Sequence, residues 1–339
     1  MDRRERVIMA LKHKETDIVP FQMDFTSDEY HKMAKYWGGY DFFNTIPNHL
    51  HGHAYNGFRG EIDGKPGYFI DDFGVEWNRT GADKDIGVIT KPVITSIENT
   101  KYNFPKVNVE RLKKEIQATY ETKQDKFFFG GIGFSMFERA WSLMSMEETL
   151  ISMILNPNAL TKLLEDICEY NLKVMDIYLQ YPIDGFYFGD DWGQQRGLIM
   201  GASNWRMFIK PMMEKLYAKA KNAGKFVLQH SCGDNLEIFP DLIDIGLDCY
   251  QTFQPEIYDI EKVKKEFGND LAFWGGISTQ QLLPKSHPDE VRSEVKRLLE
   301  ILGKNGGYIA GPTHAIPPDV PEENVVAMFE VLTNQLSKY

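Results

Sequence analysis

The segment FVLQHSCGDN, residues 226–235, places a histidine and a cysteine two residues apart where a buried strand should end. Side chains at positions i and i+2 of a strand point to the same side, so the His230 imidazole and the Cys232 thiol can converge on one point. The pair could be core packing, a cysteine nucleophile with its base, or two ligands of a metal ion. Nucleophilic catalysis is the weakest interpretation, because no orienting group or oxyanion hole is evident nearby.

A zinc ion needs at least three protein ligands, so this pair requires a partner from another strand. His314, in the segment GPTHAIPPD at the end of the last predicted strand, is the best candidate by position. A separate run, His49, His51 and His53 in IPNHLHGHAY, could also chelate a metal by strand alternation. That run is loop-like, and a polar surface segment is the alternative interpretation.

Two adjacent carboxylates, Asp190 and Asp191, follow the strand predicted in DGFYFGDD. They could hold a substrate amine or orient a metal-bound histidine, and the alternative is that one of them caps the segment that follows. Aromatic residues near the strand ends are typical of a core, but at one rim they would suit a flat or apolar substrate. These are Phe137, Trp141, Tyr187, Trp192 and Trp274.

From about residue 106 onward, short apolar runs alternate with helical segments, a pattern typical of a parallel sheet wound by βα units. The runs are KFFFGGIGF, DGFYFGDD, KFVLQHS, DCYQTF, LAFWGG and GYIAGP. With further candidate strands in PFQMDF and DDFGVEW, they predict an α/β protein, a (β/α)8 barrel of the TIM type. We expect one domain over residues 1–339, with an irregular segment from about 20 to 105. An open sheet has the same local pattern, but no GxGxxG fingerprint follows any of these strands.

In such a barrel the chemistry lies on the loops at the carboxyl ends of the strands. The carboxylates at 190 and 191, the His-x-Cys pair and His314 all fall at those ends. Their shared position makes a common site the stronger interpretation.

Composition limits the classes of partner. The 339 residues carry a formal net charge of −11, which argues against a nucleic-acid-binding surface. Three cysteines in a chain of this length do not make a disulfide framework, so we expect a reducing cytoplasm. No segment reaches the ~18 apolar residues of a membrane span, and we expect no membrane partner.

Several segments together resemble the uroporphyrinogen decarboxylase superfamily along almost the whole chain. They are MDRRERVIMALKHKETDIVPF, DDFGVEW, SMFERAW, DGFYFGDDWG, FIKPMMEKL, LQHSCGD, FWGGISTQQLLP and GGYIAGPTHAIPPDVPEENVVAMFE. The superfamily contains porphyrinogen decarboxylases and zinc-dependent methyltransferases that work with corrinoid proteins. The decarboxylases carry an arginine-rich segment after the first strand, whereas this chain reads PFQMDFTSDEY there, without arginine.

The methyltransferase branch carries H-x-C-G and a later cysteine in a G-x-C-x-I-x-P-x-x-P-x-x-N segment. This chain keeps the first motif at 230–233 and the frame of the second, but His314 stands where cysteine is usual. The resemblance therefore implies zinc on His230, Cys232 and His314, with Asp190 and Asp191 in the catalytic site. A fourth position would be shared between substrate and a side chain of the strand around 249–256; the alternatives are Gln251, Gln254 and Glu256.

The histidine at 314 predicts the direction of the chemistry. Replacing a thiolate by a neutral imidazole leaves more positive charge on zinc, which should be the stronger Lewis acid. We therefore expect zinc to polarise the oxygen of a methyl ether, a methoxylated aromatic compound being the first expectation. The methyl group would pass to the corrinoid of a partner protein, because this chain has no Asp-x-His-x-x-Gly corrinoid motif.

Two other functions are open. The chain could be a metal-free decarboxylase, in which Asp24, Asp71 or Asp72 would stabilise a protonated intermediate. It could also be a non-catalytic binding protein that kept the barrel. Metal content separates the first alternative from the methyltransferase, and loss of His230 without consequence would favour the second.

Overall fold

The computed structural model describes residues 1–335 apart from 56, 82–84 and 99–101. Residue contacts divide the chain into two compact units, each assembled from segments that are distant in the sequence. Unit 1 contains Met1–Gly52, Glu121–Phe129 and Leu247–Tyr339, and unit 2 contains His53–Tyr120 and Gly130–Gly246. The single domain over residues 1–339 stays a prediction.

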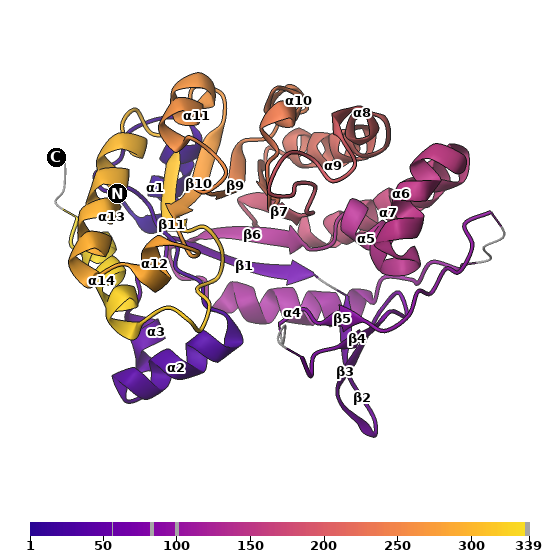
Figure 1. Cartoon of the computed structure of the whole chain (residues 1–339), viewed down its shortest axis with the longest axis horizontal. Helices are drawn as coiled ribbons and strands as arrows, with labels where there is room; N and C mark the ends of the chain where they lie inside the picture. Colours follow the sequence, from indigo (N-terminus) through magenta and orange to yellow (C-terminus); the bar gives the residue numbers. More distant parts are fainter. Residues whose placement is uncertain (56, 82–84, 99–101, 336–339) are drawn as a thin grey trace. The chain divides into compact units, whose positions relative to one another are not determined.

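The central sheet has seven strands in the order β1-β6-β7-β8-β9-β10-β11 (Figure 1). They are β1 (Leu50–Tyr55), β6 (Phe127–Ile132), β7 (Gly185–Gly189), β8 (Phe226–His230), β9 (Cys249–Phe253), β10 (Ala272–Ile277) and β11 (Tyr308–Pro312). β7 pairs with β8 in parallel, and β10 pairs in parallel with both β9 and β11. All six strands predicted beyond residue 106 are present, and the α/β class is confirmed.

The segment PFQMDF, residues 20–25, does not form the predicted strand. It is extended and makes two isolated parallel bridges with unit 1 residues, Phe21 to Ala310 and Phe25 to Ile316. Its other edge reaches the chain before β1, where the His49 N–H donates to the Phe21 carbonyl at 3.0 Å. The segment thus takes the place of an eighth strand, but the seven regular strands do not close into the predicted barrel by themselves.

In the segment 20–25, backbone N–H groups that a regular β-ladder would use donate to side chains instead. The Phe21 N–H donates to His49 Nδ1 at 3.3 Å, and the Met23 N–H donates to Asn48 Oδ1 at 2.8 Å. Pro20 has no N–H to offer. A sequence that reads as a strand therefore remains an extended segment.

Two other predictions for the N-terminal region were wrong. The loop-like HLHGHAY segment contains β1, the first strand of the central sheet. DDFGVEW contributes instead to a separate antiparallel sheet of unit 2, with the order β2-β3-β4-β5. Those strands are β2 (Phe58–Ile62), β3 (Lys65–Asp71), β4 (Glu76–Asn78) and β5 (Val88–Ile89).

The helices of unit 1 are α1 (Arg3–Leu11), α2 (Ser27–Trp37), α3 (Asp41–Thr45), α11 (Ile260–Phe267), α12 (Leu282–Lys285), α13 (Pro288–Leu302) and α14 (Glu322–Thr333). Those of unit 2 are α5 (Phe137–Met144), α6 (Met146–Leu155), α7 (Pro157–Tyr178), α8 (Ala202–Asn204), α9 (Lys210–Asn222) and α10 (Phe239–Asp244). α4 (Val109–Glu121) ends where the chain passes back to unit 1. A π-helical turn, Trp205–Ile209, precedes α9, and a 3-10 turn, Leu236–Ile238, precedes α10.

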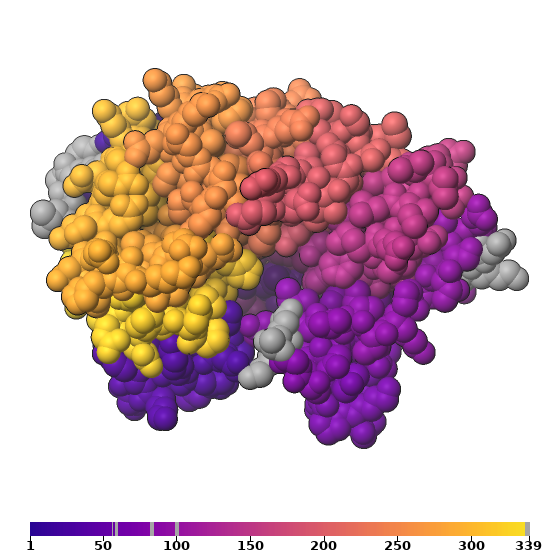
Figure 2. Space-filling model, viewed as in Figure 1, coloured from indigo at the N-terminus to yellow at the C-terminus, as the bar shows by residue number. Residues whose placement is uncertain are grey.

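Helix α2 is tied to the segment that follows β11. On the surface of unit 1 the indigo N-terminal helices lie beside yellow C-terminal residues (Figure 2). Lys32 Nζ donates to the Pro318 carbonyl at 2.9 Å and also to the Val320 carbonyl. The same ammonium group forms an ion pair with Glu29 at 2.7 Å, and the Glu29 side chain is fully buried.

Burial raises the pKa of Glu29 to about 7, although Lys32 opposes the shift. The folded state therefore holds a proton that the unfolded chain releases above its ordinary pKa, so the free energy of unfolding should fall as pH rises from about 4.5 to 7. We expect Glu29→Gln to remove this loss, with a gain of up to about 3 kcal/mol at pH 8 and little gain at pH 4.5. Thermal unfolding across this pH range measures it, with the exposed Glu323→Gln as control. A difference between Glu29→Gln and the natural protein that does not change with pH would contradict the expectation.

Candidate metal centre

The His-x-Cys pair lies at the end of β8, as predicted. His230 is the last residue of the strand, and Cys232 follows in a tight turn at Gly233, whose φ is +81°. A Cβ on Gly233 would lie 2.1 Å from the carbonyl carbon of Gly193, so only glycine lets the two loops approach. The Gly193 N–H also donates to the Cys232 carbonyl at 3.2 Å, which places the turn against the loop after β7.

A buried asparagine that the sequence analysis missed completes this turn. The Asn235 amide donates to the carbonyl of Cys232 at 3.1 Å, to that of Gly233 at 3.2 Å and to Ser231 Oγ at 3.2 Å. The residues Gly-Asp-Asn that follow the cysteine are typical of a tight turn, so the sequence could have indicated that Asn235 stabilises one here.

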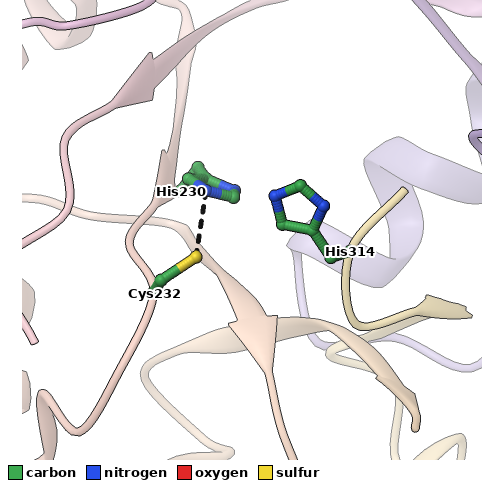
Figure 3. Close-up of side chains that lie close together, drawn as sticks. All are labelled: His230, Cys232 and His314. Carbon is green, nitrogen blue, oxygen red and sulfur yellow. Dashed lines mark hydrogen bonds between the residues drawn. The ribbon is translucent and has the colours of Figure 1, made fainter. Parts of the chain in front are cut away.

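The donor atoms of the pair are spaced like two ligands of one zinc ion. His230 Nε2 lies 3.5 Å from Cys232 Sγ (Figure 3). With zinc–nitrogen and zinc–sulfur bonds of ~2.0–2.1 and ~2.3 Å, two tetrahedral ligands stand about 3.6 Å apart. The pair therefore fits zinc without rearrangement, and both side chains are only partly exposed.

The third histidine predicted from sequence joins the pair. One donor atom from each of His230, Cys232 and His314 can be chosen so that all three lie within 4.8 Å of one another (Figure 3). Among the described residues this is the one group of three or more histidine, cysteine or acidic side chains close enough to hold a metal.

His314 is positioned by the strands of unit 1. It stands two residues beyond β11, and the preceding Thr313 N–H donates to the Ile277 carbonyl at the end of β10 at 2.9 Å. The Gln251 side chain, from β9, donates to the Thr313 carbonyl at 3.1 Å. The loop that carries His314 is therefore bonded to β10, the neighbour of β11, and to β9 beyond it.

The two aspartates after β7 have different surroundings. The Asp190 carboxylate is fully buried and accepts from the N–H groups of Phe137 and Glu138, at 2.9 and 2.8 Å, and from the Trp192 indole at 2.5 Å. It caps the first turn of α5, a helix that precedes it in the chain, and not the segment that follows, which was the alternative predicted from the sequence. Burial raises the pKa of this carboxyl, and its backbone donors oppose the shift.

Asp191 faces the His-x-Cys pair. Its Oδ1 accepts from the Cys232 N–H at 2.8 Å and lies 3.5 Å from His230 Nε2. The adjacent Glu138 is partly exposed, and its pKa is raised by burial and by the charges of Asp191 and Asp190.

We expect Asp191→Asn to weaken zinc binding by about 10- to 100-fold, because the Asp191 carboxylate holds the Cys232 N–H, and the hydrogen-bond partners of metal ligands fix their position. Chelator competition on the purified protein measures the zinc affinity. Asp176→Asn, which removes an exposed carboxylate from α7, should leave it unchanged. Equal zinc affinity in the two variants would show that Asp191 does not position the pair.

The three alternatives for a fourth ligand are placed differently. Glu256 accepts from the Ser278 hydroxyl, and Gln254 Oε1 accepts from the Thr252 hydroxyl at 3.3 Å. The Gln251 amide is bonded to the residue before His314. Gln251 is therefore the alternative most directly joined to a candidate ligand.

The other histidine run does not form a cluster. His49 is buried against Phe21, and burial lowers its pKa to about 4. His51 Nε2 lies 3.1 Å from the Thr122 hydroxyl, and His53 Nδ1 lies 2.7 Å from the Tyr178 hydroxyl. Each histidine has its own partner, as in a structural strand.

Asp71 and Asp72, which the decarboxylase hypothesis would use, are both engaged within unit 2. Asp71 is fully buried and forms an ion pair with Arg139 at 2.6 Å. Asp72 pairs with Arg111 and accepts from the Tyr55 hydroxyl at 2.6 Å. Asp24 forms no ion pair with the described residues and accepts from the Gln22 amide at 2.9 Å.

Comparison with known proteins places the chain in a family. The family model of uroporphyrinogen decarboxylase (URO-D) matches residues 71–335, which is most of the chain. The chain belongs to the URO-D family. This confirms the resemblance found in its sequence.

The relatives include both decarboxylases and methyltransferases. A methylated-thiol–coenzyme M methyltransferase of Methanosarcina mazei is 24% identical over 129 residues, 38% of this chain and 32% of the relative. A uroporphyrinogen decarboxylase of Coxiella burnetii is 23% identical over 181 residues, 52% of this chain and 48% of the relative. The chain thus spans about a third of one relative's length and about a half of the other's.

The solved structure of a methyltransferase from Methanosarcina mazei shares the fold. It superposes with a TM-score of 0.73 at 18% identity and covers 98% of both chains. None of the described helices is both long and apolar enough to cross a lipid bilayer.

Proposed function

We propose that the chain is a zinc-dependent methyltransferase, which moves a methyl group from a methoxylated compound to a corrinoid carried by a partner protein. The convergence of His230, Cys232 and His314 is the observation that carries this proposal. One sulfur and two imidazoles are the ligand types that zinc prefers, and three protein ligands leave a position for substrate, as in catalytic zinc sites.

The donor set favours ether cleavage over thiol activation. A thiolate with two neutral imidazoles contributes one negative charge, whereas two thiolates would contribute two. When bound, zinc supplies Lewis acidity that polarises the ether oxygen of the methyl donor. An aromatic methoxy compound is favoured, because its departing oxygen is stabilised by the ring.

The chain's own residues have distinct parts in this proposal. His230, Cys232 and His314 would hold the metal, with the thiol deprotonated and the imidazoles neutral. Asp191 accepts from the Cys232 N–H, so it positions the turn that carries the thiol. Gln251 steadies the loop of His314 and is our choice for the fourth position when substrate is absent. Asp190 contributes only by capping the first turn of α5, where it accepts from two backbone N–H groups.

The partner is inferred from the chemistry that the reaction needs. Methyl transfer from an ether requires a strong nucleophile, which a reduced corrinoid supplies and no described side chain does. A methyltransferase among the relatives supports group transfer in this family. A metal-free decarboxylase is the second candidate, since other relatives carry the name uroporphyrinogen decarboxylase.

Metal analysis with a transfer assay tests the proposal. The purified protein should contain about one zinc per chain and should methylate free cob(I)alamin from at least one of a panel of methoxy compounds. The spectral change of cob(I)alamin on methylation reports the reaction. Protein that is active on a porphyrinogen without metal, or that neither binds zinc nor transfers methyl groups, would overturn it.

A further inference from the structure

Lys264, a lysine that the proposed function does not use, lies at the amino ends of the last strands of unit 1. It belongs to the last turn of α11 and is only partly exposed. Its Nζ donates to the Gly306 carbonyl at 2.6 Å and to the Gly307 carbonyl at 2.9 Å. Both glycines directly precede β11, and the Gly307 carbonyl also accepts from the Phe273 N–H of β10 at 3.1 Å. Backbone atoms therefore fix this amine at the opposite end of β11 from His314.

The two carbonyl bonds match the hydrogen-bonding capacity of a neutral amine. A neutral amine has two N–H groups and one lone pair, whereas an ammonium ion has three N–H groups. Two carbonyl acceptors satisfy the neutral form completely and leave its lone pair unused. Gly307 has a φ of +67°, and a Cβ there would stand 2.8 Å from Lys264 Nζ, so only glycine lets the amine approach the chain this closely.

The groups around Lys264 do not stabilise its charged form. Burial lowers the pKa of Lys264 to about 8. The Cys249 thiol of β9 opposes this shift, but burial raises the pKa of that thiol and keeps it neutral. His13 Nδ1 donates to the Gly268 carbonyl at 3.0 Å, and burial lowers the pKa of this imidazole, so it is neutral as well. Roughly half of the Lys264 amine is therefore uncharged at pH 8, and a desolvated lysine of this kind is a nucleophile.

Lys264 lines an open cavity of about 860 Å³ at the surface of unit 1. Three further lysines, all exposed, line the same cavity: Lys262, Lys265 and Lys304. The two acidic side chains in its wall have other partners, since Asp259 accepts from the Lys262 N–H at 3.1 Å and Glu261 pairs with Arg297. The cavity therefore offers cations to an anionic ligand, although the whole chain has a net charge of −11.

We propose that Lys264 is a modification site, at which an acyl phosphate transfers its acyl group to the Nζ atom. The Nζ lone pair attacks the acyl carbon, and the bond between that carbon and the phosphate oxygen breaks. Inorganic phosphate leaves with the electron pair, and the Nζ proton passes to water. The cavity lysines stabilise the charge of the departing phosphate. The product amide keeps one N–H, so one of the two glycine carbonyls before β11 loses its hydrogen bond.

Acetyl phosphate is the probe, and the reaction needs neither zinc nor a corrinoid. The purified protein is incubated with it at about pH 8, and mass spectrometry of its peptides measures the initial acetylation rate at each lysine. We expect Lys264 to react at least about tenfold faster than Lys114, an exposed lysine of α4. The rate at Lys264 should level off above about pH 8, because the amine is then neutral, while the rate at Lys114 should continue to rise.

The role of the phosphate is tested separately. Lys265→Ala removes a cation from the cavity, so it should slow acetylation of Lys264 by acetyl phosphate about threefold, and added inorganic phosphate should also slow it. Lys114→Ala is the matched control and should leave the rate at Lys264 unchanged. N-acetylimidazole, an acyl donor without phosphate, should still prefer Lys264 but should respond to neither change.

Equal acetylation rates at Lys264 and Lys114 would overturn the proposal. A preference for Lys264 that neither Lys265→Ala nor inorganic phosphate reduces would overturn the assignment of acyl phosphates as the donors.

Discussion

Replacing His314 by alanine should reduce bound zinc from about one per chain to less than a tenth, and methyl transfer to cob(I)alamin by a factor of at least about 10³. The variant leaves two protein ligands, His230 and Cys232, and two are too few for a catalytic zinc site. His314 is exposed, so the fold should survive its loss. Zinc analysis, circular dichroism and the transfer assay together separate loss of metal from loss of structure.

Two further variants sharpen this result. His287→Ala removes a histidine whose side chain is 72% exposed, and it should retain both zinc and activity. His314→Cys should retain zinc but cleave the ether more slowly, because a second thiolate lowers the Lewis acidity of the metal. Full zinc and full activity in His314→Ala would refute the assignment of this residue.

Removing the guanidinium of Arg139 should destabilise the protein by about 3–5 kcal/mol. Arg139 is 3% exposed and pairs with Asp71, which is fully buried, and its guanidinium also lies 4.0 Å from the centre of the Phe73 ring. Arg139→Ala leaves the Asp71 charge buried without its cation, although the Phe73 and Val75 N–H groups still donate to it. Urea unfolding measures the free energy of unfolding.

The control for this prediction is another arginine that pairs with an aspartate. Arg206 is 43% exposed and bonds Asp241 at 2.9 Å, so Arg206→Ala should cost no more than about 1 kcal/mol. Equal costs for the two variants would show that the buried pair contributes no more than a surface pair.

The strands beyond residue 106 could be predicted because they are buried on both faces. Every residue of β9, β10 and β11 is buried, and such strands read as continuous apolar runs. β1 has a different pattern, since its ends are buried while His51, Gly52 and His53 are partly exposed. His53 bonds the Tyr178 hydroxyl, which lies 125 residues further along the chain. The residues around His53 therefore could not predict this contact.

The candidate site could be predicted only in part from the sequence. Residue type and strand-end position indicated His230, Cys232 and His314, and the structure brings these three together. Sequence could not separate Asp190 from Asp191, because adjacent identical residues differ only in the direction that the backbone gives them. One carboxylate caps α5 and the other faces the His-x-Cys pair. Choosing among Gln251, Gln254 and Glu256 likewise required their hydrogen bonds.

The composition of unit 1 has a consequence for biosynthesis. Met1–Gly52 belongs to the same unit as Leu247–Tyr339, and Phe21 pairs with Ala310 across 288 intervening residues. During translation the first 52 residues therefore cannot complete the fold of unit 1 until the last part of the chain is made. Unit 2 can fold earlier, because its last segment ends at Gly246. His314 leaves the ribosome well after His230 and Cys232. The nascent chain thus acquires the complete set of proposed metal ligands only near the end of synthesis, when unit 1 can also fold.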